Sequence, residues 1–545
     1  MDISDLRTIA AGAVVHAEVC IVGSGPVGHA VASELALAGI SVVVIESGGR
    51  EPDAWVDSLN EVENVGAPRV VDQRLVRNRG LGGSSRTWSG RLAAFDNADF
   101  ERRPWVPGSG WPIARPEMAR FLAAAATHLG GVVGDNLAPG HVDGILARSI
   151  RFDGGPLVDY LWSYSRHDSR SRDFRRFATV AEAPVMAGVR CLLNATVTQV
   201  EVTAQADTVI GLEVGGLDGR FRRVSSPVVV LCAGGIENAR LLLASDRVVR
   251  GGLGNAHDQV GRHLMDHQRG PVARFREADI DAAQRTFGSF RRVLDGTPTV
   301  LTRGVAFSRN HQRDRGLLNA AAWLNGRVSP EDPIDALSRM GRMRGDSIRD
   351  AITLARGAPR LVQAAARFTL GRSPVRRMLG LDLECMVEVS PDPDSRITLS
   401  NRRDVLGVPI SRVDWRVGER EARTLQAMAH TFMRESARLG LPVPQPTEEV
   451  DDGVVPASFL DVAHPTGATR MSSDPATGVV DTDCAVFGIR GLFVAGSSVF
   501  PSSGHANPTQ TAVALAIRLA RHIASDKSDN SSWRTPSDAV ATASS

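Results

Sequence analysis

Two short stretches near the end of the chain carry residue types that could move a proton. His464 opens the run His-Pro-Thr-Gly, which places an imidazole beside a glycine turn. Asn507, in the run Gly-His-Ala-Asn-Pro-Thr, presents an amide just before a proline-led helix start. An imidazole base and a polar orienting group are suited to abstracting a hydroxyl proton, provided that another group accepts a hydride. His505, two residues before Asn507, is a second candidate base.

Several other chemistries are excluded by the residues that the chain lacks. Lys527 is the only lysine and lies in a Ser/Asp-rich tail, which is unsuited to a Schiff-base nucleophile. Tyr160 and Tyr164 are the only tyrosines, so a Tyr-x-x-x-Lys nicotinamide dehydrogenase is excluded. His263 and His267 are spaced i and i+4 but lack the glutamate of a H-E-x-x-H zinc site, so no metal is expected.

The N-terminal stretch predicts a dinucleotide site that could hold the hydride acceptor. An apolar strand at 19–22 leads into Gly-Ser-Gly-Pro-Val-Gly, a helix at 29–38 and a second strand at 41–45. Glycines at such a turn let backbone N–H groups approach a pyrophosphate, and Glu46 could accept from a ribose hydroxyl. An acid at position 46 disfavours a 2′-phosphate. The three glycines of the pattern are Gly23, Gly25 and Gly28.

Three further segments are expected to join this nucleotide-binding unit. The Gly/Ser run at 79–91 is a candidate anion- or flavin-binding loop; the alternative, a solvated linker, is disfavoured by Trp88 within it. Segment 227–244 reads as a buried strand, a glycine turn and a helix. Residues 491–498 read as one more strand and turn, followed by a helix at 509–524.

Length and composition bound the class of protein. A chain of 545 residues exceeds what one hydrophobic core normally serves, so two or more lobes are expected. A net charge of +2 implies neither nucleic acid nor an anionic membrane as a partner. No apolar run reaches transmembrane length and the N-terminus lacks signal-peptide features, so a cytoplasmic location is expected. The five scattered cysteines suit a reducing compartment: Cys20, Cys191, Cys232, Cys385 and Cys484.

The middle of the chain changes in character and predicts a second lobe. Alternating runs at 272–275, 299–307 and 319–324 indicate strands of an antiparallel sheet, and helices are expected at 115–129 and 419–438. The arginine-rich stretch 331–379 reads as an insertion or lid; its charges fit a solvated face more readily than substrate recognition. We therefore assign 1–100, 185–270 and 455–525 to the nucleotide-binding domain, 101–184 and 271–454 to a substrate domain, and 526–545 to a disordered tail.

The order of these motifs resembles the glucose–methanol–choline (GMC) oxidoreductase family of FAD-dependent alcohol oxidases and dehydrogenases. The resemblance spans nearly the whole chain and is carried by seven motifs: Gly23–Gly28, Gly82–Ser85, Cys232–Glu237, Val260–His267, Asp394–Arg396, His464–Gly467 and Asn507–Thr509. It implies an α/β fold: a Rossmann-like, doubly wound βαβ FAD-binding domain plus an α+β substrate domain with an antiparallel sheet. The runs Gly110–Ile113 and Gly504–Asn507 are more similar to the sugar-oxidising branch.

The resemblance implies roles for individual residues. His464 would take the hydroxyl proton while hydride passes to flavin N5, and Asn507 would bind the same oxygen. Thr87 stands where some relatives carry a histidine bonded to flavin, so non-covalent FAD is expected. Many relatives have an acid where this chain has Gly496. The expected cofactor contacts are Gly23, Gly25, Gly28, Glu46, Gly82, Gly83, Ser84, Trp88, Ala233, Gly234, Gly496, Ser497 and Thr509.

The leading hypothesis is an FAD-dependent enzyme that oxidises the CH–OH group of a sugar, glycoside or similar polar metabolite. Its partners would be a small-molecule alcohol and oxygen or another electron acceptor. Two alternatives stay open: a non-redox lyase of the hydroxynitrile-lyase type that keeps FAD structurally, and a degenerate flavoprotein scaffold. The identity of the alcohol, the electron acceptor and the oligomeric state are not determined by these motifs.

Overall fold

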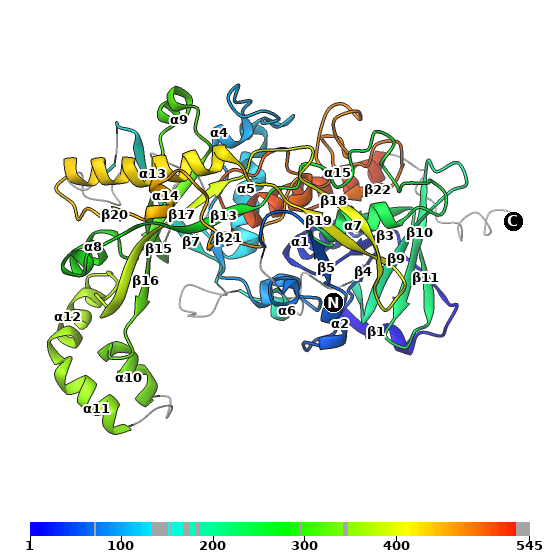
Figure 1. The fold of residues 1–545 in the computed structure, drawn as a ribbon. Helices are drawn as coiled ribbons and strands as arrows, with labels where there is room; N and C mark the ends of the chain where they lie inside the picture. Colours follow the sequence, from blue (N-terminus) through cyan, green and yellow to red (C-terminus); the bar gives the residue numbers. More distant parts are fainter. Residues whose placement is uncertain are drawn as a thin grey trace, which may run out of the picture.

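The computed structural model describes residues 1–69, 72–132, 151–152, 154–166, 175–180, 186, 188–294, 296–341 and 347–529. Figure 1 shows two sheet-based lobes, with a parallel sheet on one side and a larger antiparallel sheet on the other. Among the described residues, every helix is too short or too polar to span a bilayer. The five cysteines are all buried and free.

A six-stranded parallel sheet forms the centre of the first lobe. Its strand order is β1-β8-β4-β3-β12-β22. The strand before the first crossover, β3, therefore pairs with the strand after it, β4. This confirms the expected doubly wound, Rossmann-like domain. The strands are β1 (Asp2–Asp5), β8 (Val189–Leu193), β4 (Val42–Ile45), β3 (Val19–Val22), β12 (Val228–Leu231) and β22 (Leu492–Val494).

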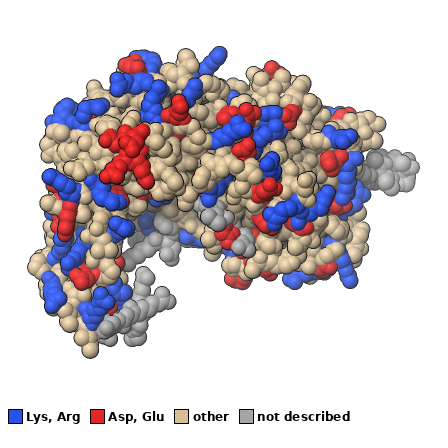
Figure 2. Space-filling view, in the orientation of Figure 1, with Lys and Arg blue, Asp and Glu red and all other residues tan. Residues whose placement is uncertain are grey.

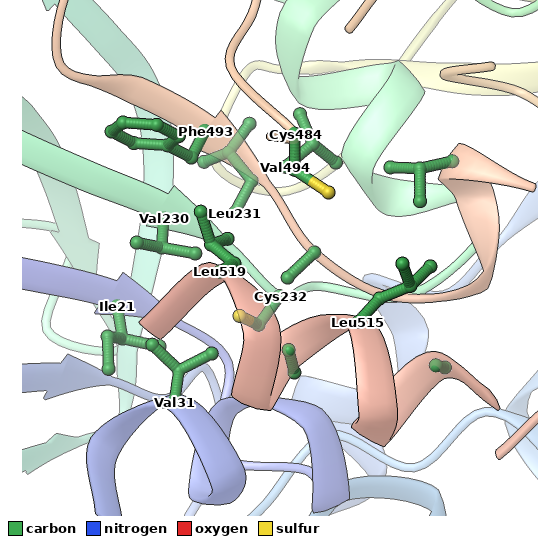
Figure 3. Close-up of a cluster of buried hydrophobic side chains, with 14 of the residues drawn as sticks. Ile21, Val31, Val230, Leu231, Cys232, Cys484, Phe493, Val494, Leu515 and Leu519 are labelled. Carbon is green, nitrogen blue, oxygen red and sulfur yellow. The ribbon is translucent and has the colours of Figure 1, made fainter. Parts of the chain in front are cut away.

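Two helices cover the parallel sheet because their apolar residues recur at helical spacing. Helices α1 (Pro26–Leu37) and α15 (Thr509–Asp529) pack against each other and against the sheet. Figure 3 shows Val31 of α1 and Leu519 of α15 beside Ile21 and Val230 of the sheet, and all four are fully buried. Each such side chain contributes about 1.5–3 kcal/mol relative to an exposed one.

A second, four-stranded sheet flanks the parallel one and reveals an error in the sequence prediction. Its order is β2 (Val14–His16), β11 (Phe221–Ser225), β10 (Val209–Gly216) and β9 (Ala195–Val202). The alternating residue types over 191–202 predict one strand, but β8 and β9 belong to different sheets. The chain turns at Asn194, which has φ 54° and donates from Nδ2 to Asp5 Oδ2 at 2.6 Å. Asparagine tolerates this left-handed conformation, and a local apolar pattern does not report it.

The second lobe is built on a nine-stranded sheet whose neighbouring strands pair antiparallel, as expected. Helix α13 (Glu419–Arg438) packs Leu425, Met428 and Phe432 onto it, at the spacing of one helix face. The main path is β20 (Gln445–Pro446), β13 (His267–Arg274), β17 (Met378–Glu388), β16 (Ala320–Val328), β15 (Thr297–Phe307), β7 (Leu157–Tyr164) and β6 (Arg91–Leu92).

Sheet membership bears on the expected domain boundaries without fixing them. Strand β6 lies within the range 1–100 assigned to the nucleotide-binding domain, yet it pairs with β7 in the second lobe. Helix α5 (Arg115–Leu129) covers the residues expected of it. Helix α15 continues to Asp529, so residues 526–529 are helical rather than part of a disordered tail. Residues 530–545 lie outside the described residues.

The arginine-rich stretch forms three helices between β16 and β17. They are α10 (Pro333–Gly341), α11 (Ser347–Arg356) and α12 (Ala358–Thr369), and they project from the body at the lower left of Figure 1. Residues 342–346 lie outside the described residues. On the face drawn in Figure 2, basic and acidic side chains are interspersed, as the small net charge of +2 implies.

Candidate functional site

A cavity of about 520 Å³ opens at the carboxyl ends of β3, β4, β12 and β22. Ligands of doubly wound sheets bind at this edge. The walls come from segments far apart in the sequence: the turn after β3, the loop 75–91, the turn after β12, residues 462–465 and residues 495–512. Of the described residues in 331–379, none lines this cavity.

The turn between β3 and α1 is shaped for a phosphate. Gly25 caps α1 without any side-chain hydrogen bond, so the N–H groups of the first turn face the cavity. A helix N-terminus with free N–H groups attracts anions. A Cβ atom at Gly28 would lie 2.0 Å from the carbonyl oxygen of Gly23, so only glycine permits this close packing of helix on strand. The turn therefore fits the pyrophosphate of a dinucleotide.

Glu46 follows β4 as expected, but its carboxylate is already engaged. It accepts from the backbone N–H of Ser24 at 2.9 Å and from the Ser24 hydroxyl at 2.7 Å. It also accepts from the N–H of Gly80 at 2.9 Å and of Gly48 at 3.2 Å. Glu46 thus ties the phosphate turn to the glycine-rich loop, and a ribose hydroxyl would replace one of these donors.

The end of the cavity near Glu46 contains a buried charge cluster that the sequence analysis did not identify. Glu237 accepts from Arg77 at 2.9 Å, from Arg79 at 2.8 Å and from Arg240 at 3.1 Å. Burial alone would raise the pKa of Glu237, but the three guanidinium groups lower it below its usual range. The glutamate is the first residue of α7 (Glu237–Ala244), just after the glycine turn that had been recognised.

At the other end, His464 contacts a second histidine. Nδ1 of His464 lies 3.0 Å from Nδ1 of His267, and the two rings meet edge to face. Nε2 of His267 lies 2.9 Å from the carbonyl oxygen of Gly504. Burial lowers the pKa of His267 to about 4, and burial together with His267 lowers the pKa of His464 well below its usual value. Both imidazoles are therefore neutral at pH 7.

These contacts assign the protons of the two neutral rings. A carbonyl oxygen only accepts, so Nε2 of His267 carries the hydrogen and donates it to Gly504. Nδ1 of His267 then has a lone pair, which accepts from Nδ1–H of His464. The second nitrogen of His464, Nε2, is consequently unprotonated. His464 lines the cavity, so it can present this lone pair to a bound molecule.

A buried ion cluster fixes the backbone of both histidines. Oδ1 of Asp266 accepts from the backbone N–H of His267 at 2.7 Å and of His464 at 3.0 Å. Its other oxygen accepts from Arg69 at 3.2 Å, and Arg69 also donates to Asp461 at 3.1 Å. Burial raises the pKa of Asp266 to about 7, although Arg69 opposes the shift. This cluster sets the spacing of the imidazole pair.

Asn507 and His505 come from one loop but take different places. Asn507 lines the cavity, and its Oδ1 has no hydrogen-bond partner within the described part of the chain. His505 is fully buried behind the loop, with its ring 4.8 Å from that of Tyr160, and is absent from the lining of the cavity. Burial lowers the pKa of His505 to about 3. Of the two, Asn507 is the one positioned to meet a ligand.

One face of the nine-stranded sheet carries aromatic and charged side chains beside the histidine pair. In the antiparallel register, Trp323 lies opposite Glu384. Arg91 lies opposite Tyr164, and Trp162 precedes Tyr164 by two residues, so it lies on the same face of the strand. Arg91 lines the cavity together with His464 and Asn507. We call Arg91, Trp162, Trp323, Arg269 and Glu384 the sheet-face group.

The structure brings most of the sequence-predicted site residues to one cavity. Thirteen of the sixteen line it; Gly28, Gly82 and His505 do not. Gly28 acts through the packing of α1, and Gly82 adopts φ 89° at the start of the glycine-rich loop. The role of His267 and the sheet-face group were missed because they depend on strand pairing between distant segments. The sequence had singled out His267 only as one of two histidines at i and i+4 that do not make a zinc site.

Comparison with known proteins adds to this geometry. Residues 391–516 match the family model described as GMC oxidoreductase, and residues 16–53 match the one described as FAD binding domain. The fructose dehydrogenase large subunit of Gluconobacter japonicus is 26% identical over 345 residues, covering 62% of this chain and 54% of that protein. Paromamine 6'-oxidase of Streptomyces fradiae is 24% identical over 555 residues, covering 93% and 91%.

A solved structure shares the fold. Pyridoxine 4-oxidase from Mesorbium loti aligns with a TM-score of 0.55 at 18% identity, covering 93% of this chain and 99% of that one. The alignment with the fructose dehydrogenase subunit, in contrast, spans only about half of that relative's length, 54%.

Proposed function

Since the chain belongs to the glucose–methanol–choline (GMC) oxidoreductase family and its cofactor is FAD, we propose that it oxidises the CH–OH group of a sugar, glycoside or similar polar metabolite to the carbonyl. The observation that carries this proposal is the unprotonated Nε2 of His464 in the same cavity as the phosphate turn. The names of two relatives, the fructose dehydrogenase large subunit and paromamine 6'-oxidase, support a sugar-like substrate.

In the proposed mechanism, His464 acts as the general base. Its Nε2 takes the hydroxyl proton as the O–H bond breaks, and the ring becomes an imidazolium. Nδ1–H stays donated to His267, which keeps the ring oriented throughout. The carbon–oxygen single bond becomes a double bond while the hydrogen on carbon leaves with its electron pair. FAD, when bound, supplies the acceptor for that hydride. Proton and hydride together account for the two hydrogens lost.

Asn507 is proposed to position the reacting oxygen. Its amide lines the cavity with His464, and an amide N–H can donate to an alkoxide-like oxygen as negative charge develops. Removing one such donor typically slows a reaction by about 10²–10³-fold. His505, buried behind the loop, is not needed for this step.

The test is a panel of sugars, glycosides and polyols mixed anaerobically with the purified holoenzyme. We expect at least one compound to bleach the visible band of oxidised flavin and to yield the corresponding carbonyl product. A compound that is cleaved into a carbonyl and a second product without bleaching would instead support the lyase alternative. If the panel causes neither bleaching nor conversion, the scaffold alternative gains support.

We further propose that FAD is held without a covalent bond. Thr87 lines the cavity and donates its hydroxyl to Asn78 at 2.6 Å, and His464 is the sole histidine among the described lining residues. Acid precipitation should therefore release all of the flavin into the supernatant, measured by its absorbance. Yellow colour retained in the washed pellet would contradict this expectation.

A further inference from the structure

We propose that Arg91 binds an oxyanion, a carboxylate or a phosphate ester, carried by the alcohol substrate. The proposal rests on the alcohol oxidation at His464 proposed above and adds to it the chemical class of the substrate. Arg91, His464 and Asn507 line one cavity, so a molecule whose hydroxyl meets His464 can place a second group at Arg91.

Two tryptophans hold the guanidinium of Arg91. Its Cζ atom lies 4.6 Å from the ring centroid of Trp323 and 5.3 Å from that of Trp162. Trp162 is fully buried and Trp323 is 3% exposed, so both rings are fixed in the sheet. A guanidinium stacked on a ring keeps its N–H groups at its edges, where they can reach both oxygens of an oxyanion.

The charge of Arg91 is not neutralised by a neighbouring carboxylate. The guanidinium of Arg91 forms no hydrogen bond or ion pair within the described part of the chain, although its backbone pairs with that of Tyr164. The nearby carboxylate, Glu384, is bonded to Arg269, which itself lies 5.3 Å from the ring of Trp323. The sheet-face group thus has two guanidinium groups and one carboxylate, which leaves one positive charge facing the cavity.

Two other arginines that stack on buried rings differ from Arg91, because each is paired with a carboxylate. Arg303 lies 5.1 Å from the ring of Phe287 but is paired with Asp159 at 2.7 Å. Arg69 lies 5.2 Å from the ring of Trp415 and forms ion pairs with Asp266 and Asp461. Both are fixed by carboxylates of the protein, whereas Arg91 offers its N–H groups to a ligand.

The position of Arg91 also affects the base. Burial and His267 are the main causes of the lowered pKa of His464, and Arg269 and Arg91 lower it further by repulsion. A cation beside a base opposes proton uptake unless an anion offsets its charge. A bound oxyanion at Arg91 would provide that offset in the enzyme–substrate complex.

The test uses the holoenzyme and matched substrates. For each sugar that reduces the flavin anaerobically, the neutral parent, its uronate and its 6-phosphate are compared by kcat/KM. We expect the uronate or the phosphate to be preferred by about tenfold or more, because the neutral parent leaves the charge-assisted hydrogen bonds of Arg91 unmade. Arg91→Gln should remove that preference, and added salt should weaken it. The two anionic substrates distinguish a carboxylate from a phosphate site.

A second measurement needs no turnover. Acetate and inorganic phosphate are titrated into oxidised holoenzyme, and binding is read as a saturable change in the visible flavin spectrum. We expect a change in the wild type that is lost in Arg91→Gln. Arg86→Gln is the matched control, because it removes the same charge from the same loop outside the cavity, and it should keep the change.

Each outcome decides between the two proposals. Equal kcat/KM for neutral and anionic substrates, together with no spectral change on adding acetate or phosphate, would overturn the oxyanion site. The proposed alcohol oxidation would not be affected by that result. A uniform loss of rate in Arg91→Gln for all three substrates would also overturn it, because Arg91 would then act in the reaction itself. Anion binding lost in Arg91→Gln, without flavin reduction by any alcohol, would support the site and refute the proposed function.

Discussion

At the scale of single residues, proton abstraction by His464 depends on the proton positions of two imidazoles. His464 alone would leave open which nitrogen faces the cavity unprotonated. His267 settles this by donating to the Gly504 carbonyl and accepting from His464. The sequence indicated a base at His464 and an amide at Asn507, but it could not pair His464 with a residue 197 positions away.

His267 is therefore expected to act as a positioning residue. In His267→Asn the loss of one neutral hydrogen bond, about 1 kcal/mol, should slow flavin reduction by about fivefold or more. Because His267 lowers the pKa of His464, the variant should also lose activity at a higher pH than the wild type as the solution is acidified. The measurement is the anaerobic reduction rate between pH 4 and 8. If the rate is lower at every pH but falls on acidification at the same pH as in the wild type, the effect of the substitution is structural only.

At the scale of elements, the strongly periodic segments were predicted and the tertiary contacts were not. Helices α5 and α13 occupy the residues expected of them, because an apolar stripe at helical spacing is a local property. The break at Asn194 was missed because it depends on which sheet each half joins. The sheet-face group was missed because antiparallel pairing across β6, β7, β16 and β17 is non-local.

The turn between β3 and α1 makes a testable prediction at this scale. Gly28→Val would force a side chain into the carbonyl of Gly23, where even a Cβ atom would lie 2.0 Å away. We expect the purified variant to hold much less FAD than the wild type, measured as the ratio of flavin to protein absorbance. Gly341→Ala, whose added Cβ meets no described atom within 4 Å, is the control and should keep its flavin. Full FAD occupancy in Gly28→Val would contradict the assigned role of this turn.

At the scale of the whole molecule, the site exists only in the folded assembly of both lobes. The cavity joins segments from Val22 to Ala512, and the parallel sheet supplies one wall while β6 of the antiparallel sheet supplies Arg91. Buried titratable groups at this junction couple its protonation to global stability. His505, fully buried with both ring nitrogens lacking partners in the described chain, is such a group.

His505 predicts a pH-dependent difference in stability. Burial lowers its pKa to about 3, so between pH 6.5 and 3 the unfolded chain binds a proton that the folded protein does not. Acidification through this window therefore destabilises the wild type, by at most about 1.4 kcal/mol per pH unit from this group. His505→Leu removes the effect, so its melting temperature should rise relative to the wild type on going from pH 7 to pH 5. An unchanged difference between the two proteins would show that His505 is not held neutral.

The central claim, that His464 is the base that initiates oxidation at the flavin, is tested most directly by single-turnover reduction. Wild-type holoenzyme and His464→Ala are mixed anaerobically with a substrate found in the panel, and bleaching of the flavin band is followed by stopped flow. We predict that the variant retains its FAD and reduces it about 10²–10⁴-fold more slowly, the usual contribution of a general base. Reduction of the variant's flavin at a rate near that of the wild type would contradict the account.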